Sequence, residues 1–461
     1  MNFQYINRPW EPFEPKGSDP WDLRKVAHLH RRAGFGATWG EIQRDLKAGP
    51  AASVDRLLSP PAASADEEQV VESLRQGAVE SSNLRRLKAH WLYRMRFGGD
   101  PLREKLTLFW HGHFATSITK VASVTAMSRQ IETLREHALG DYSKVLAAIT
   151  SDTAMLSWLD GGTSSKERPN ENFAREFLEL FTLGTGHYSE SDVRESARAF
   201  TGWVSGPSRR TPNDANPEFL FDPAHHDDGQ KTFLSHSGQW NADDIIRLTL
   251  ESPEAADFLA RKLYRFFVDE SKVPSRELIE PLALELRNHD YSIRQVVGII
   301  LRSRHFYSQE VYRRRVKSPV ELIVGLTRML EVPRHALSLL TLANACDRQG
   351  QSLYGPPSVG GWEGGTSWIN SALLLERLNW SNDLIWGHPD SNIAAYDPIA
   401  WSQGHGIAPE KIAESLIDVL LDDGLRPEAK AIVLDAAREG RVDDLRKALQ
   451  RLLHCPEFQL A

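Results

Sequence analysis

The chain has 461 residues, of which 41% are apolar and 25% are charged, a composition typical of globular proteins. Its formal net charge of −7 argues against a general nucleic-acid binder, and its short arginine clusters are interleaved with acidic residues. The two cysteines, Cys346 and Cys455, form neither a metal-binding spacing nor a disulfide framework. The length indicates two or three domains, or one large helical unit.

The N-terminal segment carries no targeting pattern. Residues 1–20 are polar and rich in proline, and they lack the apolar stretch of a signal peptide. No window of the sequence approaches the length of a membrane span. We therefore expect a chain without a signal peptide or a membrane span, located in the cytoplasm.

The first half of the chain is predicted to be helical. Polar capping residues and Gly or Pro stops delimit its elements, as in the capping box that begins at Thr38. Helices are expected over residues 22–32, 38–49, within 65–97, from 100 to about 114, and over 121–139, 142–149, 153–159, 170–183 and 189–202.

The most informative of these helices runs from Pro169 to Gly184. Proline suits the first helical turn, and glycine suits a left-handed C-terminal cap. Phenylalanine and leucine follow helical spacing on one face, beside Glu171, Arg175 and Glu176. Buried carboxylates must pair, bind metal or take up protons, so this helix is either an ion-paired strut or part of an active site.

Residues 203–240 interrupt the helical pattern. They are rich in Pro, Gly, Asn, Asp and Ser, and Asp228-Gly229 is a tight-turn signal. We expect a small β-hairpin near 217–235, inserted between two helical halves. The fold class is thus all-α, a large multi-helix array with a β-hairpin insertion. Its parts are residues 1–202, 203–240 and 241–461, and the two halves are expected to pack as one compact unit.

The second half is also predicted to be helical, over 242–250, 253–268, 275–287, 291–303, 317–332, 335–348 and three segments in 408–454. Ser318-Pro319-Val320-Glu321 is a capping box with proline at the first helical position, which we interpret as structural. Residues 351–370 form a loop rich in Gly and Pro. Its Trp362 and Trp368 could line a substrate cleft or pack in the core.

Two further segments gather ionisable side chains. In His111-Gly112-His113, both histidines could bind one metal ion on an extended segment, whereas on a helix they would lie about 200° apart. The alternative is a buried histidine that forms a hydrogen bond. In the run from His225 to Lys231, His226 and Asp227 could supply metal ligands or an acid–base pair, and the alternative is a surface loop.

These segments together resemble a bacterial family known as domain of unknown function 1800. The matching pieces are residues 28–37, 108–115, 169–184, 195–203, 226–232, 317–321 and 354–370, in the family's order. The resemblance implies no catalytic residue or cofactor. Members are commonly encoded beside sulfatase-like secreted proteins, domain of unknown function 1501. Many members look exported, so this chain either stays in the cytoplasm or leaves the cell folded, carried by a partner.

The leading functional hypothesis is a metal-dependent enzyme, either a hydrolase or an oxidase or oxygenase. Mixed imidazole and carboxylate ligands suit divalent zinc, iron or manganese. Glu171 or a spare histidine would be the general base, and Arg175 would orient carboxylates or bind an anionic substrate. The predicted ligands are His111, His113, Glu176, His226 and Asp227.

The alternative is a non-enzymatic protein. It would be a binding or maturation partner of a sulfatase-like protein, or a module that binds peptide or glycan. In that case the same polar side chains would form buried hydrogen-bonded networks that stabilise the helical packing. A metal-free hydrolase is a third possibility, although the sequence has no G-x-S-x-G motif to support it.

Overall fold

The computed structural model of the protein describes residues 8–206, 218–422 and 424–461. Within these ranges the fold is mostly helical, as predicted. The helices are α1 Leu23–Ala33, α2 Trp39–Leu58, α3 Ala65–Glu80, α4 Leu84–Phe97, α5 Pro101–His113, α6 Ile118–Val121, α7 Val124–Glu136, α8 Tyr142–Thr150, α9 Thr153–Trp158, α10 Glu171–Glu176, α11 Glu190–Ala199, α12 Ala242–Glu251, α13 Pro253–Phe267, α14 Arg276–Asn288, α15 Ile293–Arg302, α16 Pro319–Met329, α17 Leu339–Arg348, α18 Ser371–Trp386, α19 Pro398–Gly404, α20 Ile412–Leu421, α21 Pro427–Ala436 and α22 Val442–His454.

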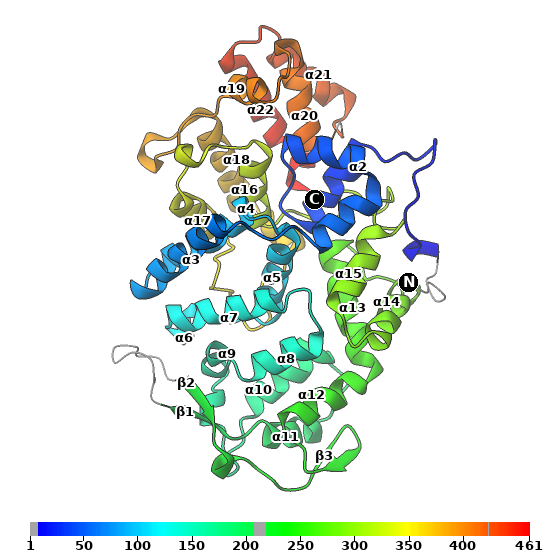
Figure 1. The fold of residues 1–461 in the computed structure, drawn as a ribbon, viewed down its shortest axis with the longest axis vertical. Coiled ribbons are helices and arrows are strands. Elements are labelled where there is room, and N and C mark those ends of the chain that lie inside the picture. Colours follow the sequence, from blue (N-terminus) through cyan, green and yellow to red (C-terminus); the bar gives the residue numbers. More distant parts are fainter. Residues whose placement is uncertain (1–7, 207–217, 423) are drawn as a thin grey trace.

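Helix α5 lies in the middle of the array. Figure 1 shows α8 to α12 at one end of the long axis and α19 to α22 at the other, with α5 between them. Helix α5 contacts α1, α2, α4 and α7. Its side chains are therefore surrounded by elements from distant parts of the sequence.

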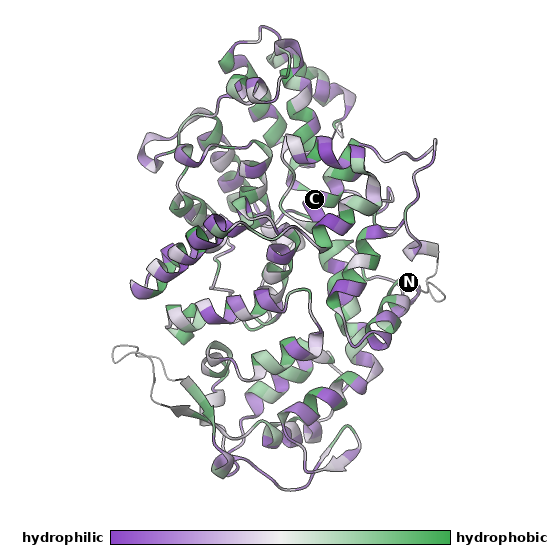
Figure 2. Ribbon diagram, in the orientation of Figure 1, coloured by the Kyte–Doolittle hydropathy of each residue, from purple (hydrophilic) through white to green (hydrophobic). Residues whose placement is uncertain are grey.

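The hydrophobic core is continuous. One cluster of buried apolar side chains runs from Trp10 to Phe458 and includes residues of most helices. Apolar residues are distributed over the whole array in Figure 2, whereas α3 is largely hydrophilic and has Ala78 as its buried residue. Across the described parts of the chain, no helix is both long and apolar enough to cross a bilayer.

Local capping rules place several helix starts where the sequence predicts them. Thr38 and Glu41 form a complete capping box at α2, as do Ser318 and Glu321 at α16. The predicted pattern over 65–97 divides into α3 and α4, because Ser82 adopts a left-handed conformation (φ 46°) and Asn83 caps α4. These starts satisfy backbone N–H groups that helices otherwise leave unpaired.

The inserted β structure consists of two small antiparallel sheets. Strand β1 (Trp203–Gly206) pairs with β2 (Glu218–Phe221), and β3 (Lys231–Phe233) pairs with β4 (His236–Gly238). The tight turn lies at Leu234-Ser235, where both φ angles are positive, and the prediction of a turn within the hairpin at Asp228-Gly229 is wrong. Asp227 accepts a hydrogen bond from the Gly229 N–H, so that pair forms a bend before β3. Residues 207–217 of the predicted insertion lie outside the described ranges.

Candidate functional site

The predicted catalytic residues Glu171 and Arg175 lie on the surface. Asn170 caps α10, which therefore begins at Glu171 and does not include Pro169. Arg175 contacts Glu171 at 3.9 Å and forms a closer pair with Glu190 at 2.7 Å. About half of the Glu171 side chain is exposed (49%). This pair is the surface bridge that i, i+4 spacing favours, and such bridges contribute little to stability.

Glu176 is half-buried at the point where α10 continues as the π-helix η3 (Phe177–Thr182). Burial and the neighbouring Glu179 raise the pKa of Glu176. Glu179 in turn accepts a hydrogen bond of 2.9 Å from the Tyr188 hydroxyl. The predicted C-terminal cap is confirmed, because Gly184 has a φ of +81°. The helix widens to π geometry after Glu176, whereas the sequence predicts one regular helix over residues 170–183.

The two histidines of α5 point to different neighbours. The helix extends to His113, so both lie within it. His111 Nε2 accepts a hydrogen bond of 3.0 Å from the Tyr354 N–H, and burial lowers the pKa of His111 to about 3. His113 instead contacts Tyr142 and the Phe181 carbonyl. Two residues of separation on a helix place the side chains on nearly opposite sides, which prevents joint chelation.

His226 and Asp227 stabilise the inserted segment. The His226 Nδ1–H donates to the Thr201 carbonyl at 2.9 Å. Asp227 accepts two hydrogen bonds from the Arg198 guanidinium, at 2.7 and 3.1 Å, and these lower the pKa of that carboxyl. Both residues thus connect the segment before β3 to the end of α11.

Four of the five predicted metal ligands, His111, His113, His226 and Asp227, therefore have separate hydrogen-bond partners. Among residues 8–206, 218–422 and 424–461, no group of three or more His, Cys, Asp or Glu side chains is placed to hold a metal ion. Metal binding and catalytic roles for Glu171 and Arg175 stay predictions from the sequence. Elemental analysis of the purified protein, beside its Glu176→Ala variant, is their direct test.

A different site forms where three of the singled-out sequence segments meet. A cavity of about 300 Å³, which we call the tryptophan pocket, is bounded by the C-terminal part of α5, by α13, by the start of α16 and by the 354–370 loop. Its lining residues are Leu108, Phe109, Gly112, His113, Lys262, Arg265, Phe266, Glu270, Arg315, Ser318, Glu321, Gln351, Gly360, Trp362, Glu363, Gly364 and Trp368. A volume of this order suits a small ligand.

The loop sits close to α5 because Gly361 packs directly against the α5 backbone at Gly112. Gly361 has a φ of +78°, and a Cβ atom there would lie 2.2 Å from the Gly112 carbonyl oxygen. This approach places Trp362 against His111, with ring centroids 5.4 Å apart and the rings nearly perpendicular. Glycine at position 361 is therefore what allows the tryptophan to form a wall of the pocket, whereas a Cβ atom at Gly112 would meet Trp362 at an ordinary contact distance of 3.9 Å.

The floor of the pocket is a buried ion network. Lys105, which is fully buried, pairs with Glu321, and Arg315 lies 3.4 Å from the same carboxylate. Arg315 also approaches Glu270 at 3.5 Å. Burial acts to raise the pKa of Glu321, but Lys105 and Arg315 outweigh it and hold that pKa well below its usual range. The carboxylates of this floor are thus already matched by internal cations.

Two cations on α13 are not matched in this way. Lys262 and Arg265 line the pocket, and neither forms a hydrogen bond or ion pair with another residue in the described ranges. The ammonium of Lys262 lies 5.2 Å from the centroid of the Phe258 ring. Burial and the neighbouring Arg265 lower the pKa of Lys262. The pocket therefore presents uncompensated positive charge beside aromatic walls.

His113 lines the same pocket and has one buried ring nitrogen without a partner in the described structure. Its Nε2 lies 3.1 Å from the Phe181 carbonyl oxygen and 3.0 Å from the Tyr142 hydroxyl, which itself donates to that carbonyl. Because a carbonyl only accepts, Nε2 carries the proton and Nδ1 does not. Nδ1 is buried without a hydrogen-bond partner in the described structure, and burial together with Lys262 lowers the pKa of His113.

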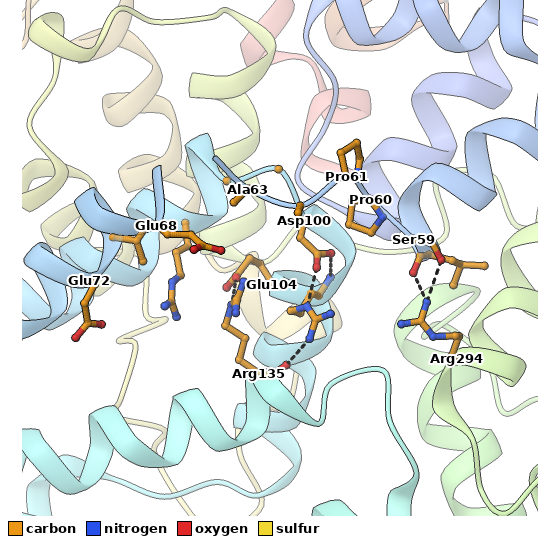
Figure 3. A pocket seen from close by; sticks show the side chains of 17 residues that line it. Ser59, Pro60, Pro61, Ala63, Glu68, Glu72, Asp100, Glu104, Arg135 and Arg294 are labelled. Atoms are coloured by element: carbon orange, nitrogen blue, oxygen red, sulfur yellow. Dashed lines mark hydrogen bonds and ion pairs between the residues drawn. The ribbon is translucent and has the colours of Figure 1, made fainter. Parts of the chain in front are cut away.

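A larger cavity, of about 700 Å³, differs in its charges. It lies between residues 58–63, α3, the α4–α5 turn, α7 and α15 (Figure 3). Arg103 pairs with Asp100 at 2.6 Å, Arg135 pairs with Glu104 at 2.6 Å, and Arg294 donates to the Leu58 carbonyl. Figure 3 shows these contacts across the cavity wall. Its arginines are therefore engaged internally, which makes the tryptophan pocket the stronger candidate site.

The sequence allows two roles for Trp362 and Trp368, a cleft wall or core packing; both line the cavity, and Trp368 is also buried. The sequence does not single out Lys262 and Arg265, because they occupy polar positions of an ordinary amphipathic helix whose buried residues include Leu259 and Leu263. A polar residue on such a helix does not reveal which distant residues the fold brings next to it.

A family model described as "Protein of unknown function (DUF1800)" matches residues 28–460, nearly the whole chain. This match confirms the resemblance seen in the sequence motifs. No curated protein and no solved structure matches the chain. The role as a partner of a sulfatase-like protein stays a prediction.

Proposed function

The chain belongs to the DUF1800 family, whose description names no activity, and we propose that the protein binds a small organic anion in the tryptophan pocket. The observation that carries this proposal is the pair of cations, Lys262 and Arg265, that line the cavity without an anionic partner in the described ranges. Lys262 is half-buried, and an unpaired charge withdrawn from bulk water is unfavourable, so an incoming anion would stabilise it, while the exposed Arg265 would add a second charge-assisted hydrogen bond.

The remaining walls select for an apolar, planar part of the ligand. Trp362, Trp368, Phe109 and Phe266 line the same cavity as the two cations. Aromatic side chains of this kind pack against rings and flat apolar groups. An anion attached to such a group would use both features, whereas inorganic phosphate would use the cations alone.

The ion network in the floor of the pocket is compatible with anion binding, because its carboxylates are paired with cations of the protein. Glu270 and Glu321 are the carboxylates in the floor of the pocket, and Arg315 lies against both. Glu270 also accepts a hydrogen bond of 2.9 Å from the Val316 N–H. Because these carboxylates are neutralised internally, the net charge at the pocket mouth comes from Lys262, Arg265 and the exposed Glu363.

Titration calorimetry and tryptophan fluorescence test this proposal. The probes are benzoate, phenyl phosphate and phenyl sulfate, each compared with the neutral analogue benzamide. We expect at least one anion to bind about tenfold more tightly than benzamide, a difference of about 1.4 kcal/mol. Binding should weaken as the salt concentration rises.

Matched variants locate the binding site. Lys262→Gln and Arg265→Gln should each weaken anion binding by about tenfold or more, since hydrogen bonds to charged groups contribute about 1.5–3 kcal/mol. Lys272→Gln is the control, because Lys272 is exposed just beyond α13 and is not in the pocket. Failure of every anion to bind, or equal weakening by Lys272→Gln, would show that the proposal is wrong.

A further inference from the structure

We propose that Lys262 forms a covalent imine with an organic anion that carries a carbonyl group next to its acidic group, such as a 2-oxo acid. This inference rests on the proposed anion binding and assigns a reactive role to one of the two cations. It requires an amine that is accessible to the ligand, free of a carboxylate partner and able to lose its proton.

Lys262 meets these requirements in the described structure. Its ammonium lines the pocket and has no hydrogen bond or ion pair there, and its ring contact with Phe258 leaves the nitrogen lone pair uncommitted once the proton has gone. A lysine that is desolvated beside another cation gives up its proton more readily than an exposed one. Arg265, one helical turn further on α13, supplies that cation.

The other lysine near the pocket cannot take this role. Lys105 is fully buried, pairs with Glu321 and donates to the Gly34 carbonyl at 2.9 Å and to the Arg31 carbonyl at 3.3 Å. All three donors of its ammonium group are therefore engaged, and Lys105 is absent from the lining of the cavity. The geometry singles out Lys262 as the reactive amine.

His113 Nδ1 can accept the proton that the attacking amine must lose. Its Nε2–H is committed to the Phe181 carbonyl and Tyr142, and its unprotonated Nδ1 has no partner in the described ranges. His113 lines the same cavity and is 5% exposed, so water competes little for Nδ1. His113 and Lys262 line one cavity, and burial together with the charge of Lys262 lowers the pKa of His113, which keeps the ring neutral and able to accept a proton.

The reaction balances without a further reagent. Neutral Lys262 Nζ attacks the carbonyl carbon, a C–N bond forms, and the carbonyl π electrons move to oxygen. His113 Nδ1 accepts one proton from the attacking nitrogen and passes it to that oxygen, which becomes a hydroxyl group. The second proton of the nitrogen follows the same route to the hydroxyl, the C–O bond breaks, water leaves, and the nitrogen lone pair forms the C=N bond. The sum is amine plus carbonyl compound giving imine plus water, with no oxidation or reduction, while Arg265 holds the carboxylate.

Reductive trapping tests the imine. The full-length protein is incubated with phenylpyruvate and sodium cyanoborohydride, and peptide mass spectrometry locates the resulting secondary amine. We expect modification of Lys262 to exceed that of the exposed Lys272 by about tenfold or more. Phenyllactate, which has a hydroxyl group in place of the 2-oxo group, should bind without forming an adduct.

Three variants separate reactivity from binding. Lys262→Arg keeps the positive charge and should bind phenyllactate but lose the adduct, whereas Lys272→Arg should leave the Lys262 adduct unchanged. His113→Gln retains an amide donor for the Phe181 carbonyl and should slow adduct formation about tenfold; circular dichroism checks its fold. If Lys262 reacts no faster than Lys272 while phenyllactate still binds, the proposed imine is wrong and the proposed anion binding is supported. If phenyllactate also fails to bind, the proposed function fails with it.

Discussion

Replacement of Glu321 by glutamine should destabilise the protein strongly, because it removes the negative charge beneath the tryptophan pocket. Glu321 is 6% exposed and pairs with Lys105, whose side chain is fully buried, and with Arg315, which is 7% exposed. Glutamine can still complete the capping box with Ser318, so helix capping is preserved. What is lost is the carboxylate partner of the fully buried Lys105 and one of the two carboxylates beside Arg315, and the removal of one partner of a buried pair costs about 3–5 kcal/mol in comparable cases.

Glu41→Gln is a matched control. Glu41 occupies the same capping-box position at α2 and pairs with Arg328 at 3.1 Å, but its side chain is 24% exposed. Arg328 also donates to the Arg96 carbonyl at 2.7 Å, so it keeps a partner after the change. We expect Glu41→Gln to cost about 1 kcal/mol or less.

Urea denaturation followed by circular dichroism and fluorescence measures both variants, and coincident transitions justify a two-state free energy. The pKa of Glu321 is held below its usual value in the folded protein, so its contribution is present above the unfolded pKa of about 4.5 and is lost as pH falls. The difference between wild type and Glu321→Gln should therefore shrink below about pH 4.5. Equal effects of Glu321→Gln and Glu41→Gln would refute the reasoning.

Two further predictions concern a buried carboxyl and the glycine contact. Burial raises the pKa of Asp152 from 3.8 to about 6, so its stabilising protonated form is lost as pH rises through about 6. Asp152→Asn should raise the unfolding free energy at pH 7 by at most about 3 kcal/mol, with the gain vanishing near pH 4; Asp397→Asn, at an exposed N-cap, should show no such trend. A gain independent of pH would contradict this cause. Gly361→Ala should cost about 1–3 kcal/mol and weaken anion binding, because of its positive φ and the Gly112 carbonyl. Gly404→Ala, with open space around its Cβ position, is the control, and an equally small effect of both would contradict it.

Helix positions in this chain were largely predictable, because caps and amphipathic spacing are local signals. The Thr38 and Ser318 capping boxes form as expected. Helix α18 escaped prediction, since its apolar residues surround it: Trp380 is buried while Leu375 is exposed. The π-helix after Glu176 also escaped, because it depends on how the helix end packs against distant elements such as Tyr142.

The sequence by itself determined the helical class, the family and the presence of unusual segments such as His111-Gly112-His113 and the tryptophan-containing loop. Only the tertiary structure decided which of these segments meet. His113 and Trp362 lie 249 positions apart in sequence yet line one cavity, and Lys262 joins them from α13. The physical reason is that charge compensation is a property of neighbours in space. Glu321 has its cations and Lys262 lacks an anion because of helix packing, which local spacing does not encode.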